Sequence, residues 1–190
     1  ASGDGFFAWG FQLEAGSFAT SYIPTTTASV VRSADVCSIT GANFTSFYNT
    51  PEGTLFAGVT PRTVDQLANV VSVNTTTSSN QHGIFKSNAI AGGAGAYWTG
   101  TSNPPPIVIA SANFVAGDFS KIAYAYKSGS FALAYNNILA GTSSAAFTSI
   151  NPTTMRIGVR DDGLAINGHL ASIRYYKKRL PNAKLAQLTV

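Results

Sequence analysis

Carboxylates are the residues of this chain that could do hydrolytic chemistry. Glycoside hydrolysis generally uses two of them, about 5–10 Å apart. On one strand such a pair would stand at i and i+2 or i+4, facing one groove. No two acids show that spacing, and the residues therefore predict no catalysis, with a polysaccharide-degrading enzyme as an alternative that needs acids from distant strands. The eight acids are Asp4, Glu14, Asp35, Glu52, Asp65, Asp118, Asp161 and Asp162.

Lyase chemistry would need a tyrosine, histidine or lysine base beside a neutralising side chain, and no local pattern supplies this set. His82 lies in "NQHG", which reads as a turn, and His169 precedes a leucine at the start of a strand. The single cysteine, Cys37, excludes an intrachain disulfide and a cysteine-based zinc site, and we expect it in the core as a small apolar residue.

Two stretches combine aromatic rings with amide and hydroxyl groups, the usual elements of sugar recognition. Residues 96–103, "AYWTGTSN", offer Tyr97, Trp98 and Asn103, and residues 43–50, "NFTSFYNT", offer Tyr48 and Asn49. These five residues are the candidate carbohydrate site. The alternative is that the rings are buried in the core, as aromatic residues of sandwich strands usually are.

The amino-acid composition limits the kinds of partner that we expect for this chain. Charged residues make up 11% of the chain, the net charge is +4, and no apolar run approaches the roughly 18 residues of a membrane span. Basic residues gather near the C-terminus. We interpret them as solvent-exposed charges on an edge strand and its following turn, and not as a surface that binds nucleic acid. We therefore expect no nucleic acid and no membrane insertion. These basic residues are Arg174, Lys177, Lys178, Arg179 and Lys184.

Alternation of apolar and polar residues dominates the chain. Residues 121–141 form three strands of a meander, in which tyrosines occupy one face and alanines the other, and Asn136-Asn137 makes a tight turn. A bulge is expected at Ala171-Ser172, and residues 183–188 are the one convincing helical segment. Ten to fourteen short strands predict an all-β sandwich or barrel. Further strands are expected at residues 30–39, 53–61, 69–76, 83–87, 95–100 and 154–160.

Two spaced motifs stand out in the last third of the chain. The first consists of Phe131, Leu133, Asn136 and Gly141, and the second of Gly168, Leu170, Ile173, Tyr176 and Leu180. With these motifs the last third resembles the concanavalin A-like, laminin-G-type jelly roll, which implies two antiparallel sheets with a short C-terminal helical turn. Relatives of this kind often hold calcium through loop carboxylates, which makes Asp161 and Asp162, with Asp118, the metal candidates. The plainer interpretation is that they are turn aspartates, with no cofactor.

The opening, "WGFQLEAGSFATSYIPT" followed by "RSAD", resembles a junction in tail-fibre and virion-surface proteins of tailed bacteriophages and prophages. The resemblance implies that residues 1–27 are the end of an upstream β module plus a linker, and that residues 28–190 are the sandwich domain. It implies a virion-surface location, other virion proteins and a homotrimer as partners, and binding of a host-surface glycan without catalysis. A purely structural decoration or oligomerisation domain is the alternative.

Overall fold

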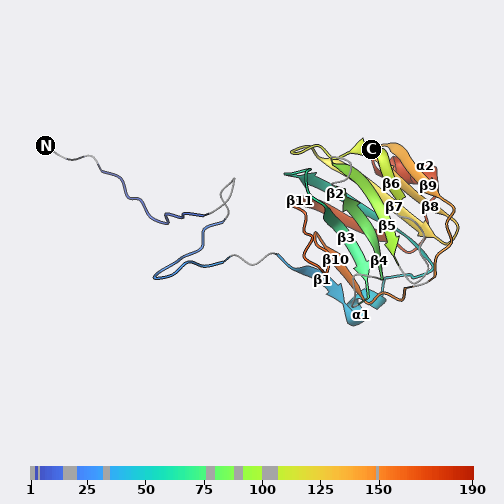
Figure 1. Cartoon of the computed structure of the whole chain (residues 1–190), viewed down its shortest axis with the longest axis horizontal. Coiled ribbons are helices and arrows are strands. Elements are labelled where there is room, and N and C mark those ends of the chain that lie inside the picture. The colour runs from blue at the N-terminus through green and yellow to red at the C-terminus, as the bar shows by residue number, and fades with distance from the viewer. Residues whose placement is uncertain are drawn as a thin grey trace. The chain divides into compact units, whose positions relative to one another are not determined.

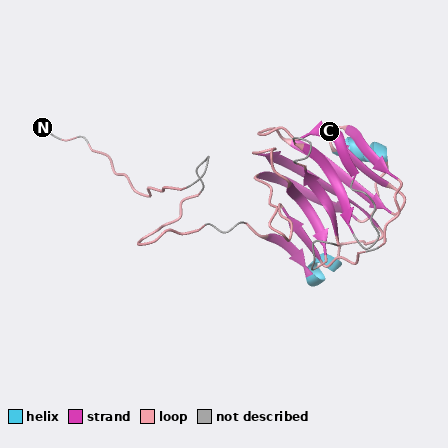
Figure 2. Cartoon of the chain, in the orientation of Figure 1, coloured by secondary structure: helices cyan, strands magenta, loops and turns pink. Residues whose placement is uncertain are grey.

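Two antiparallel β-sheets packed face to face form the body of the protein (Figure 1). The computed structural model describes residues 3, 5–14, 21–31, 35–75, 80–87, 92–99, 107–148 and 150–190, with the backbone alone for 107–112. The expected jelly-roll β-sandwich is confirmed, since strands make up nearly all regular structure of this described part (Figure 2). No helix in it has the length and apolar character needed to cross a membrane.

The six-stranded sheet has the order β1-β10-β3-β4-β5-β6, and the five-stranded sheet has the order β11-β2-β7-β8-β9. The first contains β1 (Cys37–Thr40), β10 (Thr154–Ile157), β3 (Ala68–Asn74), β4 (Gln81–Lys86), β5 (Gly93–Thr99) and β6 (Ile107–Asn113). The second contains β11 (Gly168–Tyr176), β2 (Glu52–Pro61), β7 (Ser120–Lys127), β8 (Phe131–Tyr135) and β9 (Ile138–Ser143). Two short helices, α1 (Gly41–Thr45) and α2 (Asn182–Leu188), complete the described elements.

Period-two alternation sorts the side chains of β7 and β8 onto two faces. Tyr124 and Leu133 pair across the strands and point into the core between the sheets. The alanines point the other way and form a smooth outer face, on which α2 packs through Leu185. Since an alanine side chain is short, a helix can approach this face closely. The face consists of Ala123, Ala125, Ala132 and Ala134, all fully buried.

Enlarging this alanine face should destabilise the protein. Ala134→Leu adds three heavy atoms beneath α2, and overpacking of this kind costs about 1–3 kcal/mol of unfolding free energy. Ala183→Leu, on the exposed first turn of α2, is the matched control and should stay within about 0.5 kcal/mol of the wild type. Urea denaturation of the two variants checks this, and equal stabilities would show that α2 does not pack on the sheet.

Local signals in the meander and the last strand are confirmed. Asn136 and Asn137 have φ values of 42° and 66°, the left-handed region that a tight hairpin requires. The register of β11 on β2 shifts between Leu170 and Ser172, where a bulge was expected. The expected helix over 183–188 is α2. Helix α1 was not predicted.

Of the described residues in the strand expected over 30–39, those from Cys37 onward are in a strand, and Val30, Val31, Asp35 and Val36 are not; residues 32–34 lie outside the described part. Val31 before it is 89% exposed, and Cys37 is also exposed, which contradicts the expectation of a core cysteine. The reason is that β1 is an edge strand: it pairs with β10 on one side only, and its burial pattern leaves just Ile39 half-buried.

Contacts divide the chain into two units, Ala1–Asp35 and Val36–Val190. The boundary after Thr27 expected from the sequence, with the end of an upstream module before it, stays a prediction. Within the first unit, the Gln12 side chain accepts a hydrogen bond from the backbone N–H of Ile23 at 2.7 Å, and Trp9 packs edge-on against Tyr22. The junction motif therefore has contacts of its own. None of its described residues is in a strand. A strand needs a ladder of backbone hydrogen bonds to a partner strand, and these residues do not form one.

Candidate functional site

One cavity opens where the two sheets do not meet. Each sheet has two edge strands. On one side of the sandwich the edge strands β6 and β9 of the two sheets contact each other, and on the other side the edge strands are β1 and β11. Between them lies a cavity of about 330 Å³, at the lower end of the roughly 300–1,000 Å³ typical of small-molecule sites. Its walls come from β1, β10, β11 and the segment after α1. The lining residues are Ile39, Phe47, Met155, Ile157, Ile173, Tyr175 and Lys177.

Alternation places the β11 side chains of the cavity. Ile173 and Tyr175 stand two residues apart in β11 and so project to one side, whereas Arg174 projects to the other and lies 5.5 Å from the centre of the Phe56 ring. Lys177 directly follows the last residue of β11. Opposite them, Ile39 of β1 is in register with Met155 of β10. The cavity is therefore lined by apolar residues from both sheets, with one cation where β11 ends.

Helix α1 brings aromatic residues to the cavity. Phe44 is fully buried and anchors the helix, Phe47 lines the cavity, and Tyr48 stacks on Phe44 with ring centroids 4.6 Å apart. These three residues have the i, i+3, i+4 spacing of one helix face, and Phe47 and Tyr48 lie in the turn after α1, where their backbone N–H groups donate to the carbonyl of Phe44. That spacing in "NFTSFY" is the signal that would have revealed α1, and the expectation of strands throughout concealed it.

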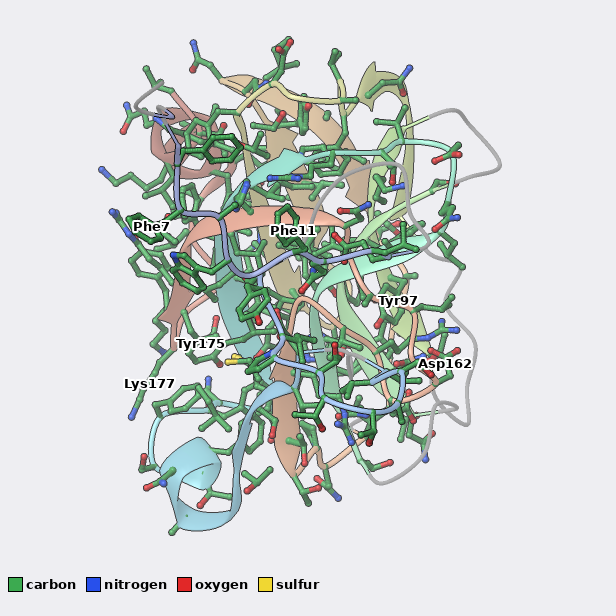
Figure 3. All side chains as sticks on the ribbon, turned by 90° about the vertical axis from the view of Figure 1, so that its left-hand side faces the viewer. Phe7, Phe11, Tyr97, Asp162, Tyr175 and Lys177 are labelled. Atoms are coloured by element: carbon green, nitrogen blue, oxygen red, sulfur yellow. The ribbon has the colours of Figure 1, made fainter. Side chains whose placement is uncertain are left out.

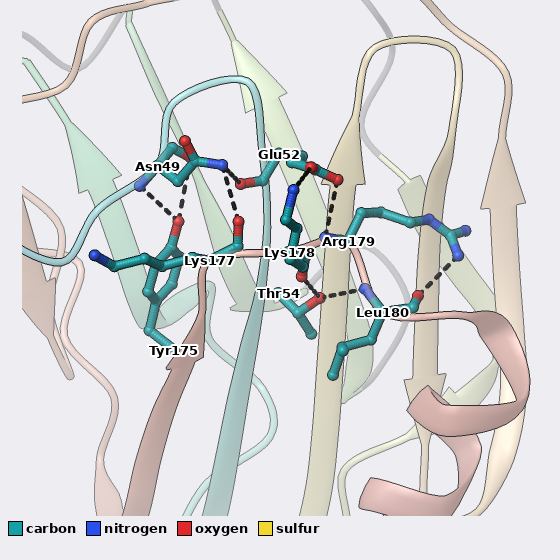
Figure 4. Close-up of polar contacts among 8 residues, drawn as sticks. All are labelled: Asn49, Glu52, Thr54, Tyr175, Lys177, Lys178, Arg179 and Leu180. Atoms are coloured by element: carbon teal, nitrogen blue, oxygen red, sulfur yellow. Dashed lines mark hydrogen bonds and ion pairs between the residues drawn. The ribbon is translucent and has the colours of Figure 1, made fainter.

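The Tyr175 ring is held in place by hydrogen bonds (Figure 4). Its hydroxyl accepts from the backbone N–H of Asn49 at 2.9 Å and lies 2.9 Å from the Tyr126 hydroxyl. Burial raises the pKa of Tyr175, which keeps the hydroxyl protonated. The Asn49 side chain donates to the carbonyls of Glu52 and Lys177, at 2.9 and 2.8 Å. Asn49, a candidate sugar contact, thus fixes the cavity wall while its amide N–H groups are occupied.

Tyr48, the second candidate of that stretch, is half-buried beside Tyr175, with which it stacks at 5.5 Å. Its hydroxyl lies 2.6 Å from Nε2 of His82. His82 was expected in a turn but is fully buried in β4, between Val73 and Trp98 of the neighbouring strands. Alternation with Ile84 is the signal that places it inward. The structure therefore links tyrosine and histidine where the sequence suggested no connection, but in the core.

The other aromatic candidates have little exposed surface. Trp98 is 2% exposed and lies between the sheets, stacked on His82 at 4.4 Å. Tyr97 is 8% exposed, and its hydroxyl donates to Oε1 of Gln81. Trp98 is enclosed between the two sheets, whereas Tyr97, the preceding residue of β5, points to the other side of the strand and packs edge-on against Phe85. Asn103 lies outside the described residues.

Asp161 and Asp162, the metal candidates, lie in a turn close to Tyr97. Figure 3 shows Asp162 on the same side of the sandwich as Tyr97. Both oxygens of Asp162 bind Arg160, whose guanidinium lowers the pKa of that carboxyl, and Oδ1 of Asp162 also accepts from the N–H of Leu164. Calcium takes six to eight oxygen ligands, and the described residues contain no cluster of three potential metal-binding side chains. Calcium at this turn stays a prediction.

The basic residues near the end of β11 differ in their contacts. Lys178 forms an ion pair with Glu52 at 3.0 Å, and Arg179 donates to Oδ1 of Asn182 at 2.6 Å. Lys178 lowers the pKa of Glu52. Lys177, by contrast, lines the cavity and has no ion pair with a described carboxylate. The charge at the cavity is therefore positive.

Comparison with known proteins supports the fold. No family model and no curated sequence matches the chain. Among solved structures, the CBM40 of the Ruminococcus gnavus IT-sialidase, bound to α2,3-sialyllactose, is 16% identical with a TM-score of 0.63, covering 75% of this chain and 84% of its own.

Domain 4 of an extracellular arabinanase from Geobacillus stearothermophilus, in complex with arabinotriose, is 11% identical with a TM-score of 0.60, covering 75% of this chain and 68% of its own. A putative carbohydrate-binding protein from Bacteroides ovatus is 10% identical with a TM-score of 0.60. The match covers 80% of this chain and 43% of the Bacteroides ovatus protein. At these identities the likeness shows the fold. The chain shares the jelly-roll β-sandwich with carbohydrate-binding modules.

Proposed function

We propose that this chain is a non-catalytic glycan-binding domain on the surface of a tailed-bacteriophage particle. The observation that carries the proposal is the cavity between β1 and β11, with the rings of Phe47 and Tyr175 in its wall. Aromatic rings pack against the C–H faces of sugars. Because hydrogen bonds to Asn49 and Tyr126 already fix Tyr175, little side-chain freedom is lost on binding.

Two further facts favour binding without catalysis. Solved structures with the same fold include carbohydrate-binding modules. Glycoside hydrolysis generally uses two carboxylates, and the residues described around the cavity include none.

The virion part of the proposal rests on the first unit. The residues that resemble a phage fibre junction contact one another there, through Gln12 with Ile23 and Trp9 with Tyr22. In this setting the domain would assemble as a homotrimer with other virion proteins. An antibody against the chain should label purified phage particles from the source of the sequence, and the chain in solution should have the mass of a trimer. Unlabelled particles would contradict the virion location.

Filling the cavity tests glycan binding. Ile39→Phe adds a ring to the cavity wall and should reduce signals on a glycan array by about tenfold or more, with the melting temperature nearly unchanged because Ile39 lies on an edge strand. Ile138→Phe, 64% exposed on β9 at the other side of the sandwich, is the matched control and should bind like the wild type. Equal binding by both variants would show that glycans bind elsewhere.

A further inference from the structure

The lining of the cavity is mostly apolar and carries one positive charge. Four aliphatic side chains and two aromatic rings line it together with one charged side chain, that of Lys177. A neutral, fully hydroxylated sugar would leave most of its hydroxyl groups without partners against such walls. The walls instead favour a ligand with an apolar substituent, and the cation favours a ligand with a negative charge. The four aliphatic residues are Ile39, Met155, Ile157 and Ile173.

Lys177 is positioned to bind an anion. Its backbone carbonyl accepts from Nδ2 of Asn49 at 2.8 Å, which fixes where the side chain begins, and Figure 4 shows the side chain extending on the same side as Tyr175. Its ammonium group has three N–H donors. The described contact, to the carbonyl of Ser46 at 3.2 Å, uses one of them. Two donors therefore remain for a ligand.

The neighbouring cations are engaged within the protein. Lys178 binds the carboxylate of Glu52, and the backbone N–H of Arg179 donates to the same carboxylate at 3.3 Å. Glu52 is thus neutralised by partners of its own. The positive charge of Lys177 is the one that the cavity offers to a ligand.

We infer that the cavity selects a sugar that carries both a carboxylate and an acyl substituent. This inference rests on the proposed function and narrows its ligand class. The carboxylate forms a charge-assisted hydrogen bond with Lys177. The acyl group packs against Ile39 and Ile157, and the C–H face of the ring contacts Tyr175.

Four saccharide probes separate the two chemical features. Sialyllactose has a carboxylate and an acyl group, lactose has neither, digalacturonic acid has only carboxylates, and N,N′-diacetylchitobiose has only acyl groups. Calorimetric titration of the full chain should give the highest affinity for sialyllactose, with lactose at least about tenfold weaker. The affinity for sialyllactose should fall as salt is added, because salt screens a charge pair at an exposed lysine.

Lys177→Gln should weaken sialyllactose binding by about tenfold and leave lactose unchanged. Lys184→Gln removes the same charge from the exposed face of α2 and should change neither. Equal affinities for sialyllactose and lactose, unchanged by Lys177→Gln but abolished by Ile39→Phe, would overturn this inference and leave the proposed function intact.

Two other outcomes would overturn the proposed function as well. One is the absence of binding to all four saccharides together with the absence of any signal on the glycan array. The other is tight binding of octanoate, abolished by Ile39→Phe, with no saccharide bound, which would make the cavity a site for aliphatic carboxylates.

Discussion

Replacing Trp98 by alanine should destabilise the sandwich by about 3–5 kcal/mol, a large part of the roughly 5–15 kcal/mol that holds a typical domain folded. The indole is 2% exposed and packs between the sheets, with its ring centroid 4.4 Å from that of His82 and 3.9 Å from that of Phe147. Its removal leaves a cavity between the sheets, and residual cavities of this kind account for much of the cost of large-to-small core substitutions. Urea denaturation followed by circular dichroism measures the loss.

Trp9→Ala is the matched control, because Trp9 is 84% exposed and belongs to the first unit. We expect its unfolding free energy to stay within about 0.5 kcal/mol of the wild type. Trp98→Phe should cost less than Trp98→Ala, since it keeps a ring and removes an indole N–H that is buried without a partner among the described residues. A Trp98→Ala protein with unchanged stability and lost glycan binding would restore Trp98 as a sugar platform.

Acidification should destabilise the protein through His82. Burial lowers the pKa of His82 to about 3 in the folded state, against about 6.5 in the unfolded chain. Between these values the unfolded chain binds a proton that the folded protein does not bind. The free energy of unfolding therefore falls as the pH drops below about 6.5, by up to about 1.4 kcal/mol per pH unit. The full histidine contribution is present above the pKa of the unfolded chain.

His82→Gln removes this titration and should flatten the pH dependence of stability between about pH 6.5 and 5, above the range where carboxylates normally titrate. His169→Gln is the matched control. It replaces the other histidine, which contacts Arg62 near the surface, and should keep the slope of the wild type. Denaturation series at several pH values measure both slopes. A wild-type slope retained in His82→Gln would assign the proton uptake to another group.

Much of the fold could be predicted from the sequence, because a strand with one buried face shows alternating apolar and polar residues along the chain. In β7 and β8, Tyr124 and Leu133 had to face one way and the alanines the other, and the structure places them so. Asn136-Asn137 marked its hairpin through local backbone preference. Such signals depend on residues close in the chain.

The candidate site was harder to predict. The stretch 43–50 was chosen for its rings and amide groups, and Phe47 of this stretch lines the cavity, whereas Tyr48 and Asn49 are not among the lining residues. Trp98 and Tyr97 had the right chemistry, yet their exposure depends on which segments cover them. Alternation tells on which face of a strand a side chain lies, and it does not tell whether that face is covered.

What the sequence alone determined is the all-β class, most of the strands with their inward and outward faces, and the turn at Asn136-Asn137, while the two-sheet architecture was what the family resemblance implied. Tertiary structure alone decided which strands form the sheet edges and where the sheets fail to meet. The cavity joins Ile39, Met155 and Tyr175, residues more than 100 positions apart at its extremes, through the pairing of β1 with β10 and the position of β11. Contacts between residues so far apart produce no periodic pattern in the sequence, because they arise only when complete sheets pack together.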